Sequence, residues 1–337
     1  MATYTHPKLP YFAPEEQLPA PLPTFEEIVS SKDNLRYYDE FIHWRKLVRV
    51  GEHFVAKFGC PRLVKLEEGE NMLLVKNNTK VRVPTVYAIY QEPYKGCVCN
   101  FIVMEYIAGD KLEIQDLMMG ERLAVTMQLR AYLNELRSIP SPGYYGVPGR
   151  EPIPVSEKAS DAIFQRLAPP APYYDPKAPF ELFASFKEMW TFARSQFWRP
   201  SDESNVAVFT HGALRPDNII IQPNGTICLL GWKSALFGPA YLEYVCAMPQ
   251  DPEHKEDWVD MIPIFLDSYK ERLSMIRNFR KEYENQEDYY YDNFYPEDEG
   301  DYGYDDSDDL GYNSYYSEDE DDSEDENDSS EHDDDSV

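Results

Sequence analysis

The residues best suited to chemistry lie close together in "FTHGALRPDN" (residues 209–218), which carries an imidazole, a carboxylate and an amide at His211, Asp217 and Asn218. Groups of these types move protons or supply oxygen ligands to a hard cation. Each also has an ordinary alternative, namely a structural histidine, a surface or helix-capping carboxylate, and an asparagine that forms a turn. The residue types alone therefore leave the chemistry open.

A second pair of candidates lies far upstream in the chain. Lys57 stands in the apolar segment "VAKFG", and Glu68 stands in "LEEGENMLLV". Lys57 could be a solubility residue at a strand edge, and Glu68 could be a solvated charge on a helix. A role in a site requires the fold to bring these two residues toward residues 209–218.

The N-terminal half of the sequence predicts a sheet, a helix and a second sheet region. Residues 1–23 contain six prolines, so we expect a loosely packed, extended arm that joins no helix or sheet ladder. Thr24 has the type and position of a helix cap. The elements expected after it are a short helix at 24–33, two strands at 47–50 and 54–56 around Gly51, a helix at 64–78, and strands at 85–91 and 97–107.

The C-terminal half is mainly helical by its spacing. The segment 121–139 places Leu123, Met127, Leu133 and Leu136 on one stripe, which predicts a core-facing helix. A second such helix is expected at 179–198, after a Pro-rich insertion at 140–178. Strands then flank an Asn224-Gly225 turn, and a last helical region covers 256–284, started or kinked by Pro263.

The segment "FTHGALRPDNIIIQPNGTICLLGW" resembles the part of the aminoglycoside phosphotransferase and choline kinase family in which "HGDLxxxN" and, after a hairpin, "IDWE" build the active site. "VAKFG", "LEEGENMLLV", "VRVPTVYAIY", "FIVMEYIAGDKLE" and "FGPAYLEYVCAM" fit the same family in order, its fungal members in particular, over residues 45–285. The resemblance implies an α+β, two-lobed protein kinase-like fold. We expect a small β-rich N-lobe at 24–108 and a mainly helical C-lobe at 109–285.

The resemblance also implies roles for individual residues. Phosphoryl transfer needs positioning and charge neutralisation more than covalent chemistry. Lys57 matches the phosphate-facing lysine and Glu68 its ion-pair partner, with Glu67 and Glu70 as weaker alternatives. The remaining matches are Met104, Glu105 and Tyr106 as the hinge that binds adenine through backbone groups, His211 as the brace of the catalytic loop, and Asn218 as a metal-holding amide.

Three positions depart from the family pattern. Ala213 stands where the catalytic Asp would lie, Gly231 stands where the metal-holding Asp would lie, and Lys233 replaces the Glu after Trp232. Loss of a general base costs about 10² to 10⁴ in rate. Gly51 alone gives a poor phosphate cradle. We therefore expect absent or very weak catalysis, ATP as the candidate cofactor, and doubtful binding of Mg²⁺, which requires oxygen ligands.

The charge of the chain is concentrated at its C-terminal end. Residues 282–337 contain 26 acidic residues and no Lys or Arg, which leaves 35 acids against 32 bases in residues 1–281. We expect a disordered acidic tail at 286–337, either a solvating appendage or an arm for a basic protein partner. The near-neutral body and acidic tail argue against nucleic acid as a partner. The apolar segments are too short for a membrane span, which favours an intracellular, cytoplasmic protein, with the nucleus also allowed.

These observations favour a catalytically impaired pseudokinase that acts by binding a small molecule, a nucleotide or a protein partner. One alternative is a weakly active, ATP-dependent small-molecule phosphotransferase that uses a relocated acid, for which Asp217 is the nearest carboxylate to Ala213. A second alternative is an interaction protein whose function resides in the acidic tail.

Overall fold

A computed structural model of the chain describes residues 4, 7–36, 45–149, 153–154, 205–249, 256–278 and 281. Contacts within the chain group residues 1–295 into one unit and 296–337 into another. All described residues belong to the first unit. The helix expected at 179–198, most of the insertion at 140–178 and the acidic tail lie outside the described residues.

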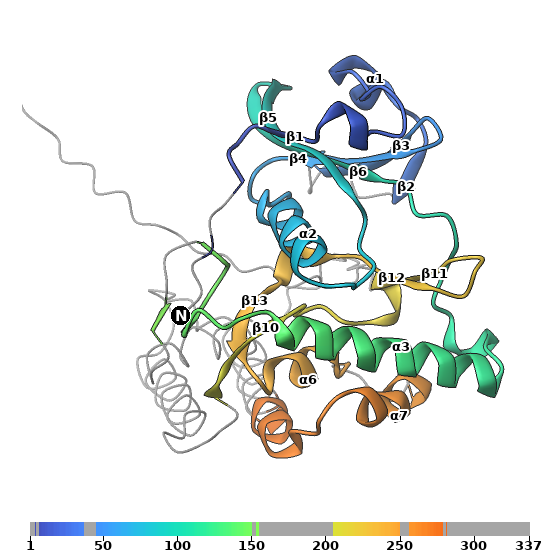
Figure 1. Cartoon of the computed structure of the whole chain (residues 1–337), viewed down its shortest axis with the longest axis vertical. Helices are drawn as coiled ribbons and strands as arrows, with labels where there is room; N and C mark the ends of the chain where they lie inside the picture. The colour runs from blue at the N-terminus through green and yellow to red at the C-terminus, as the bar shows by residue number, and fades with distance from the viewer. Residues whose placement is uncertain are drawn as a thin grey trace, which may run out of the picture. The chain divides into compact units, whose positions relative to one another are not determined.

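The first unit contains an antiparallel, six-stranded sheet (Figure 1). Hairpins connect β3 to β4 and β5 to β6, as the alternating β-branched and aromatic residues of these segments favour. In spatial order the strands are β1 (Tyr11–Phe12), β5 (Val86–Tyr94), β6 (Cys97–Glu105), β4 (Phe54–Gly59), β3 (Arg45–Val50) and β2 (Asn34–Arg36).

The N-terminal segment is partly integrated into this sheet. Tyr11 and Phe12 pair with Ile89 and Ala88 as an edge strand, and Ala13 is buried. The expectation of a loosely packed arm is therefore wrong for these residues, because the Pro-rich stretch leaves a short run without proline that can complete a ladder. The short helix α1 (Phe25–Ser30) follows, and the capping box between Thr24 and Glu27 confirms the predicted cap.

Helix α2 (Glu67–Asn78) lies against one face of the sheet, between the sheet and the C-terminal elements (Figure 1). This face and the C-terminal elements share one hydrophobic core, while the other face of the sheet forms a second core around Phe58 and Phe101, whose rings stack with centroids 5.1 Å apart. The fold is thus α+β, with a β-rich N-terminal part and helices in the C-terminal part, as predicted.

Helix α3 (Met119–Ser138) is the long helix of the C-terminal part. Leu133 and Leu136 are buried as expected, but Leu123 and Met127 are exposed by 57% and 56%. The buried stripe instead continues through Leu129, four residues before Leu133. The apolar residues near the start of α3 therefore occupy a second face, which residue type alone does not separate from the core face.

The remaining described elements follow the sheet and α2 in the chain. Hairpin β11–β12 has its turn at Asn224-Gly225, as predicted. Pro263 lies inside α7, which ends two residues later, and residues 270–278 form a separate helical segment. No helix of the described residues is both long and apolar enough to cross a membrane. The elements are β7 (Asp110–Lys111), η2 (Ile114–Asp116), β8 (Tyr144–Tyr145), β9 (Ile153–Pro154), β10 (Ala207–Thr210), η4 (Pro216–Asn218), β11 (Ile219–Ile221), β12 (Ile227–Leu229), η5 (Trp232–Ser234), β13 (Leu236–Pro239), α6 (Leu242–Ala247) and α7 (Glu256–Phe265).

Candidate functional site

Lys57 and Glu68 form an ion pair between the sheet and α2. Lys57 lies opposite Leu47 and Ile102 in the ladders of β4, and its Nζ lies 2.5 Å from Oε2 of Glu68 in the first turn of α2. Both side chains are largely shielded from water. The contact is the one expected from the resemblance, while a role of this pair in orienting phosphates stays a prediction.

Asn71 connects α2 to the segment that carries Lys233. It lies three residues after Glu68, is 2% exposed, and its Nδ2 donates to the carbonyls of Trp232 at 3.1 Å and Ala235 at 3.0 Å. These two carbonyls flank Lys233 within and just after η5. Sequence reasoning missed Asn71, although its spacing of one helical turn from Glu68 placed it on the same face.

Lys233 is therefore held close to the Lys57–Glu68 pair. The residue Lys233 is exposed at the surface, and the protein atoms around its ammonium displace part of its hydration shell. This partial desolvation, together with the positive charges of Lys57, Arg45 and Arg215, lowers the pKa of Lys233, and Glu68 acts in the opposite direction. The cations outnumber the carboxylates among these groups.

His211 is fully buried and makes two hydrogen bonds through its ring. Nε2 lies 2.8 Å from the carbonyl oxygen of Leu230, and Nδ1 accepts from the backbone N–H of Ala213 at 3.2 Å. A carbonyl only accepts and an amide only donates, so the ring is the neutral Nε2–H tautomer. Burial lowers the pKa of His211 to about 4. His211 therefore braces the loop and is not placed to exchange protons near neutral pH.

Glu243 of α6 is a buried carboxylate that sequence reasoning also missed. It accepts from the backbone N–H of His211 at 2.6 Å and from that of Gly212 at 3.3 Å. Burial raises the pKa of Glu243 to about 7 against the lowering effect of these two donors. The signal available in the sequence was an acidic residue inside the apolar run "AYLEYVCAM". The residue orients the loop that precedes Ala213.

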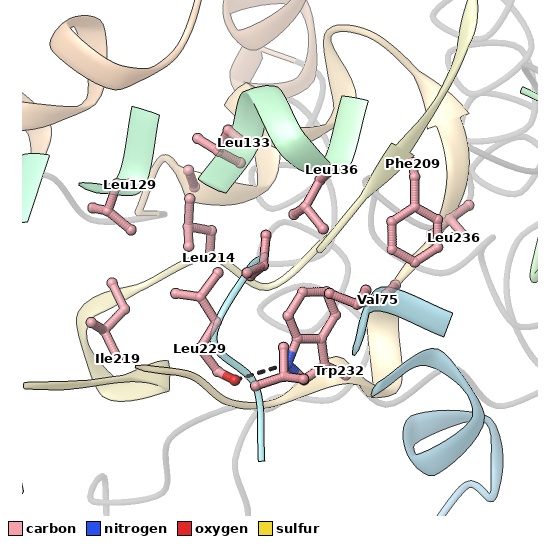
Figure 2. Packing of buried hydrophobic residues seen from close by; sticks show 14 of the residues in the cluster. Val75, Leu129, Leu133, Leu136, Phe209, Leu214, Ile219, Leu229, Trp232 and Leu236 are labelled. Carbon is pink, nitrogen blue, oxygen red and sulfur yellow. Dashed lines mark hydrogen bonds between the residues drawn. The ribbon is translucent and has the colours of Figure 1, made fainter. Parts of the chain in front are cut away.

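Trp232 packs beneath this loop and completes its support. Its ring centroid lies 4.5 Å from that of His211 in a T-shaped arrangement, and its Nε1 donates to the carbonyl of Leu229 at 2.8 Å (Figure 2). Val75 of α2 and Leu136 of α3 approach the indole in the same view. The loop is thus fixed by packing from both parts of the unit.

Asn218 fills the space between the two positions that lack an aspartate. Its Nδ2 donates to the carbonyl of Ala213 at 2.8 Å. Gly231 has a φ of +77°, and a Cβ at this position would lie 2.8 Å from the side-chain atoms of Asn218. An aspartate at 231 would need a left-handed backbone and a displaced Asn218. Asn218 therefore contacts both positions, and because its bond to Ala213 uses Nδ2, its Oδ1 keeps the capacity to accept a hydrogen bond or bind a cation.

Asp217 is exposed in the first turn of η4. This position agrees with the interpretation as a surface carboxylate. The nearest carboxylate in sequence to Ala213 is therefore solvated, and its placement does not by itself supply a substitute base.

The predicted hinge is tied down by interactions within the protein. Met104 is buried in β6. Glu105 forms a two-pronged ion pair with Arg82, at 2.5 and 2.9 Å, and these bonds outweigh burial so that the pKa of Glu105 is lowered. The backbone N–H groups of Glu105 and Tyr106 already donate to the carbonyls of Thr85 and His53. A base bound here would have to use other backbone groups of this segment or displace these bonds.

No group of three or more His, Cys, Asp or Glu side chains suited to a metal ion occurs in the described part of the chain. At positions 213, 218, 231 and 233 the side chains are a methyl group, an amide whose Nδ2 donates to the carbonyl of Ala213, a hydrogen and an ammonium, so the Asn218 amide is the one oxygen donor among these four. Residues 37–44, which follow β2 and precede β3 in the chain, lie outside the described residues and contain no glycine.

Comparisons with known proteins agree with this fold. The model of the "Phosphotransferase enzyme family" matches residues 30–276. The solved structure of a thermostable mutant of aminoglycoside phosphotransferase APH(4)-Ia, in a ternary complex with ADP and hygromycin B, aligns with a TM-score of 0.53 at 16% identity, covering 79% of this chain and 91% of that chain. ADP-bound aminoglycoside phosphotransferase APH(2'')-Ib aligns with a TM-score of 0.51 at 14% identity, covering 79% and 87%.

The comparison with curated proteins found no match. The two solved structures support the kinase-like fold alone, because their identity to this chain is low. The family match covers most of the chain, including strands β2 to β6 of the sheet, α2, the loop around His211 and the segment with Trp232. The chain belongs to the phosphotransferase enzyme family.

Proposed function

We propose that this protein is a member of the phosphotransferase family that has lost most or all catalytic power and acts by binding a ligand, with ATP as the candidate nucleotide. The observation that carries the proposal is that Ala213 and Gly231 stand at the positions of the family's aspartates and that the side chain of Asn218 lies against both of them. An alanine accepts no proton, and a missing general base raises the barrier by about 3 to 5 kcal/mol.

The residues present do not fit Mg²⁺. Magnesium requires nearly octahedral oxygen coordination, and neither Ala213 nor Gly231 has a side-chain oxygen. Lys233 adds a positive charge close to the Lys57–Glu68 pair, and a cation nearby opposes the binding of another. No catalytic step through a metal is therefore part of the proposal.

The scaffold that would hold a nucleotide is retained in part. The Lys57–Glu68 ion pair is formed, and the neighbour APH(4)-Ia mutant, described as an aspartate-to-alanine variant, was solved with ADP and hygromycin B bound together. These findings support binding without turnover in this chain. The substrate class of the neighbours is not carried over.

Two measurements test this proposal on the purified full chain. A coupled assay of ADP release from Mg·ATP should show no turnover above background, both for the unaltered protein and for Lys57→Ala. A thermal-shift titration with ATP should raise the melting temperature, since a ligand that prefers the native state stabilises it. Clear Mg·ATP-dependent turnover that disappears in Lys57→Ala would overturn the proposal.

The relocated-acid hypothesis and the acidic-tail hypothesis are each tested by a variant of their own. If Asp217 serves as a relocated acid, Asp217→Asn abolishes the turnover found in the first assay, whereas an unchanged rate removes that idea. If function resides in the acidic tail, deletion of residues 286–337 abolishes capture of a basic partner. An interactome that is unaltered by the deletion removes the second alternative.

A further inference from the structure

Arg45 and Lys57 project from the same face of the sheet. Lys57 lies directly opposite Leu47 in the ladder between β3 and β4. Because side chains alternate along a strand, Arg45, two residues before Leu47, lies on the face that carries Lys57. This is the face on which Glu68 of α2 meets Lys57.

Lys233 reaches the same region from the C-terminal part. The two hydrogen bonds of Asn71 fix the backbone on either side of Lys233 to α2, one helical turn from Glu68. Among the described groups that act on the Lys233 ammonium, Lys57, Arg45 and Arg215 are cations and Glu68 is a carboxylate. Glu68 already bonds to Lys57 at 2.5 Å, so the cations outnumber the carboxylates among these described groups.

We propose that Lys233, together with Lys57, Arg45 and Arg215, forms a metal-independent anion site that binds the phosphate groups of a nucleotide or another polyphosphate directly. The ammonium of Lys233 supplies there the positive charge that a divalent cation would otherwise bring to the phosphates. The inference rests on the proposed function and deepens it by naming how the same site holds its ligand.

The chemistry of the cluster favours a phosphate ligand over a neutral one. Guanidinium and ammonium groups make charge-assisted hydrogen bonds to phosphate oxygens that are about twice as strong as neutral ones. Arg215 and Lys233 are open to solvent, so an anion reaches them without unfolding the loop. Binding of such a ligand also relieves the mutual repulsion of the four cations.

The test uses inorganic tripolyphosphate as the probe and isothermal titration calorimetry of the full chain in EDTA. We expect binding in EDTA, and Lys233→Met should weaken it about tenfold to hundredfold, since a hydrogen bond to a charged group contributes about 1.5 to 3 kcal/mol. Lys80→Met is the matched control, because it removes one exposed positive charge from the linker after α2. It should change affinity by less than about twofold.

A second variant reverses the charge. Lys233→Glu restores the residue type of the family motif and should abolish binding of tripolyphosphate in EDTA. Because Lys233 is solvent-exposed and each substitution removes a charge that the neighbouring cations repel, both variants should melt at or above the temperature of the unaltered protein. The inference is overturned by no binding in EDTA, by binding that requires Mg²⁺, or by equal affinity of Lys233→Met and Lys80→Met.

The outcomes for this inference and for the proposed function are distinct. Tripolyphosphate binding in EDTA together with Mg·ATP turnover would support the anion site and contradict the proposed loss of catalysis. ATP binding that depends on Mg²⁺, without turnover, would contradict the anion site and agree with the loss of catalysis. The calorimetric and enzymatic assays therefore fail independently.

Discussion

The side chain of Asn71 offers the sharpest test of how the two parts of the site are joined. Asn71→Ala removes two hydrogen bonds and leaves the carbonyls of Trp232 and Ala235 without this donor, in residues that are 0% and 1% exposed. Each intramolecular hydrogen bond contributes about 0.5 to 1.5 kcal/mol, and each buried acceptor left unpaired costs about 1 to 3 kcal/mol. We therefore expect the free energy of unfolding to fall by about 2 to 4 kcal/mol.

The same helix supplies a matched control for this experiment. Asn78 is exposed, and its Nδ2 donates to the carbonyl of Leu74 within α2. Asn78→Ala should change the free energy of unfolding by less than about 0.5 kcal/mol, because alanine is a better helix former and no buried group loses a partner. Urea unfolding of both variants measures the difference. Equal effects of the two substitutions would refute the role assigned to Asn71.

Three further predictions concern the loop and its supports. Gly231→Ala should lower the free energy of unfolding by at least about 1 kcal/mol more than Gly51→Ala does. Both glycines have a positive φ, but of the two only Gly231 would place a Cβ against Asn218. Equal melting temperatures of the two variants would contradict this prediction. The pKa of Glu243 is raised to about 7, so the protonated carboxyl contributes stability that is fully present below pH about 4.5 and is lost as the pH rises through 7. Relative to Glu243→Gln, the unaltered protein should therefore lose about 3 kcal/mol between these pH values in urea titrations, and parallel profiles would count against it. Burial lowers the pKa of His211 to about 4, so neutral His211 contributes stability that is present above pH 6.5 and is lost as the pH falls toward 4. In His211→Gln, the free energy of unfolding should therefore fall less steeply between pH 6.5 and 4. An unchanged slope would contradict the role of His211 as a buried, neutral histidine.

The order of strands and helices around the site could be predicted from the sequence. Alternating apolar residues identify strands β4 and β6. The Asn224-Gly225 pair identifies the hairpin of β11 and β12, and Thr24 with Glu27 marks the start of helix α1. These signals are local, because each depends on residues within a few positions of one another. The ordered motifs also indicated the family and paired Lys57 with Glu68.

Contacts between distant segments could not be predicted in the same way. Asn71 and Glu243 are common polar residues whose partners lie 161 and 32 positions away, and no local pattern reports a bond of that span. The exposure of Leu123 and Met127 likewise depends on which face of α3 the other elements cover.

The sequence by itself determined that three carboxylates of the family motif are absent, because residue identity alone decides which side chains can accept a proton or bind a cation. Only the tertiary structure decided what lies beside these positions: the amide of Asn218 packs against Gly231, and the charges of Lys57 on β4 and Arg45 on β3 act on Lys233. The physical reason is that electrostatic and packing energies depend on separation in space, which the folding of residues far apart in the chain sets.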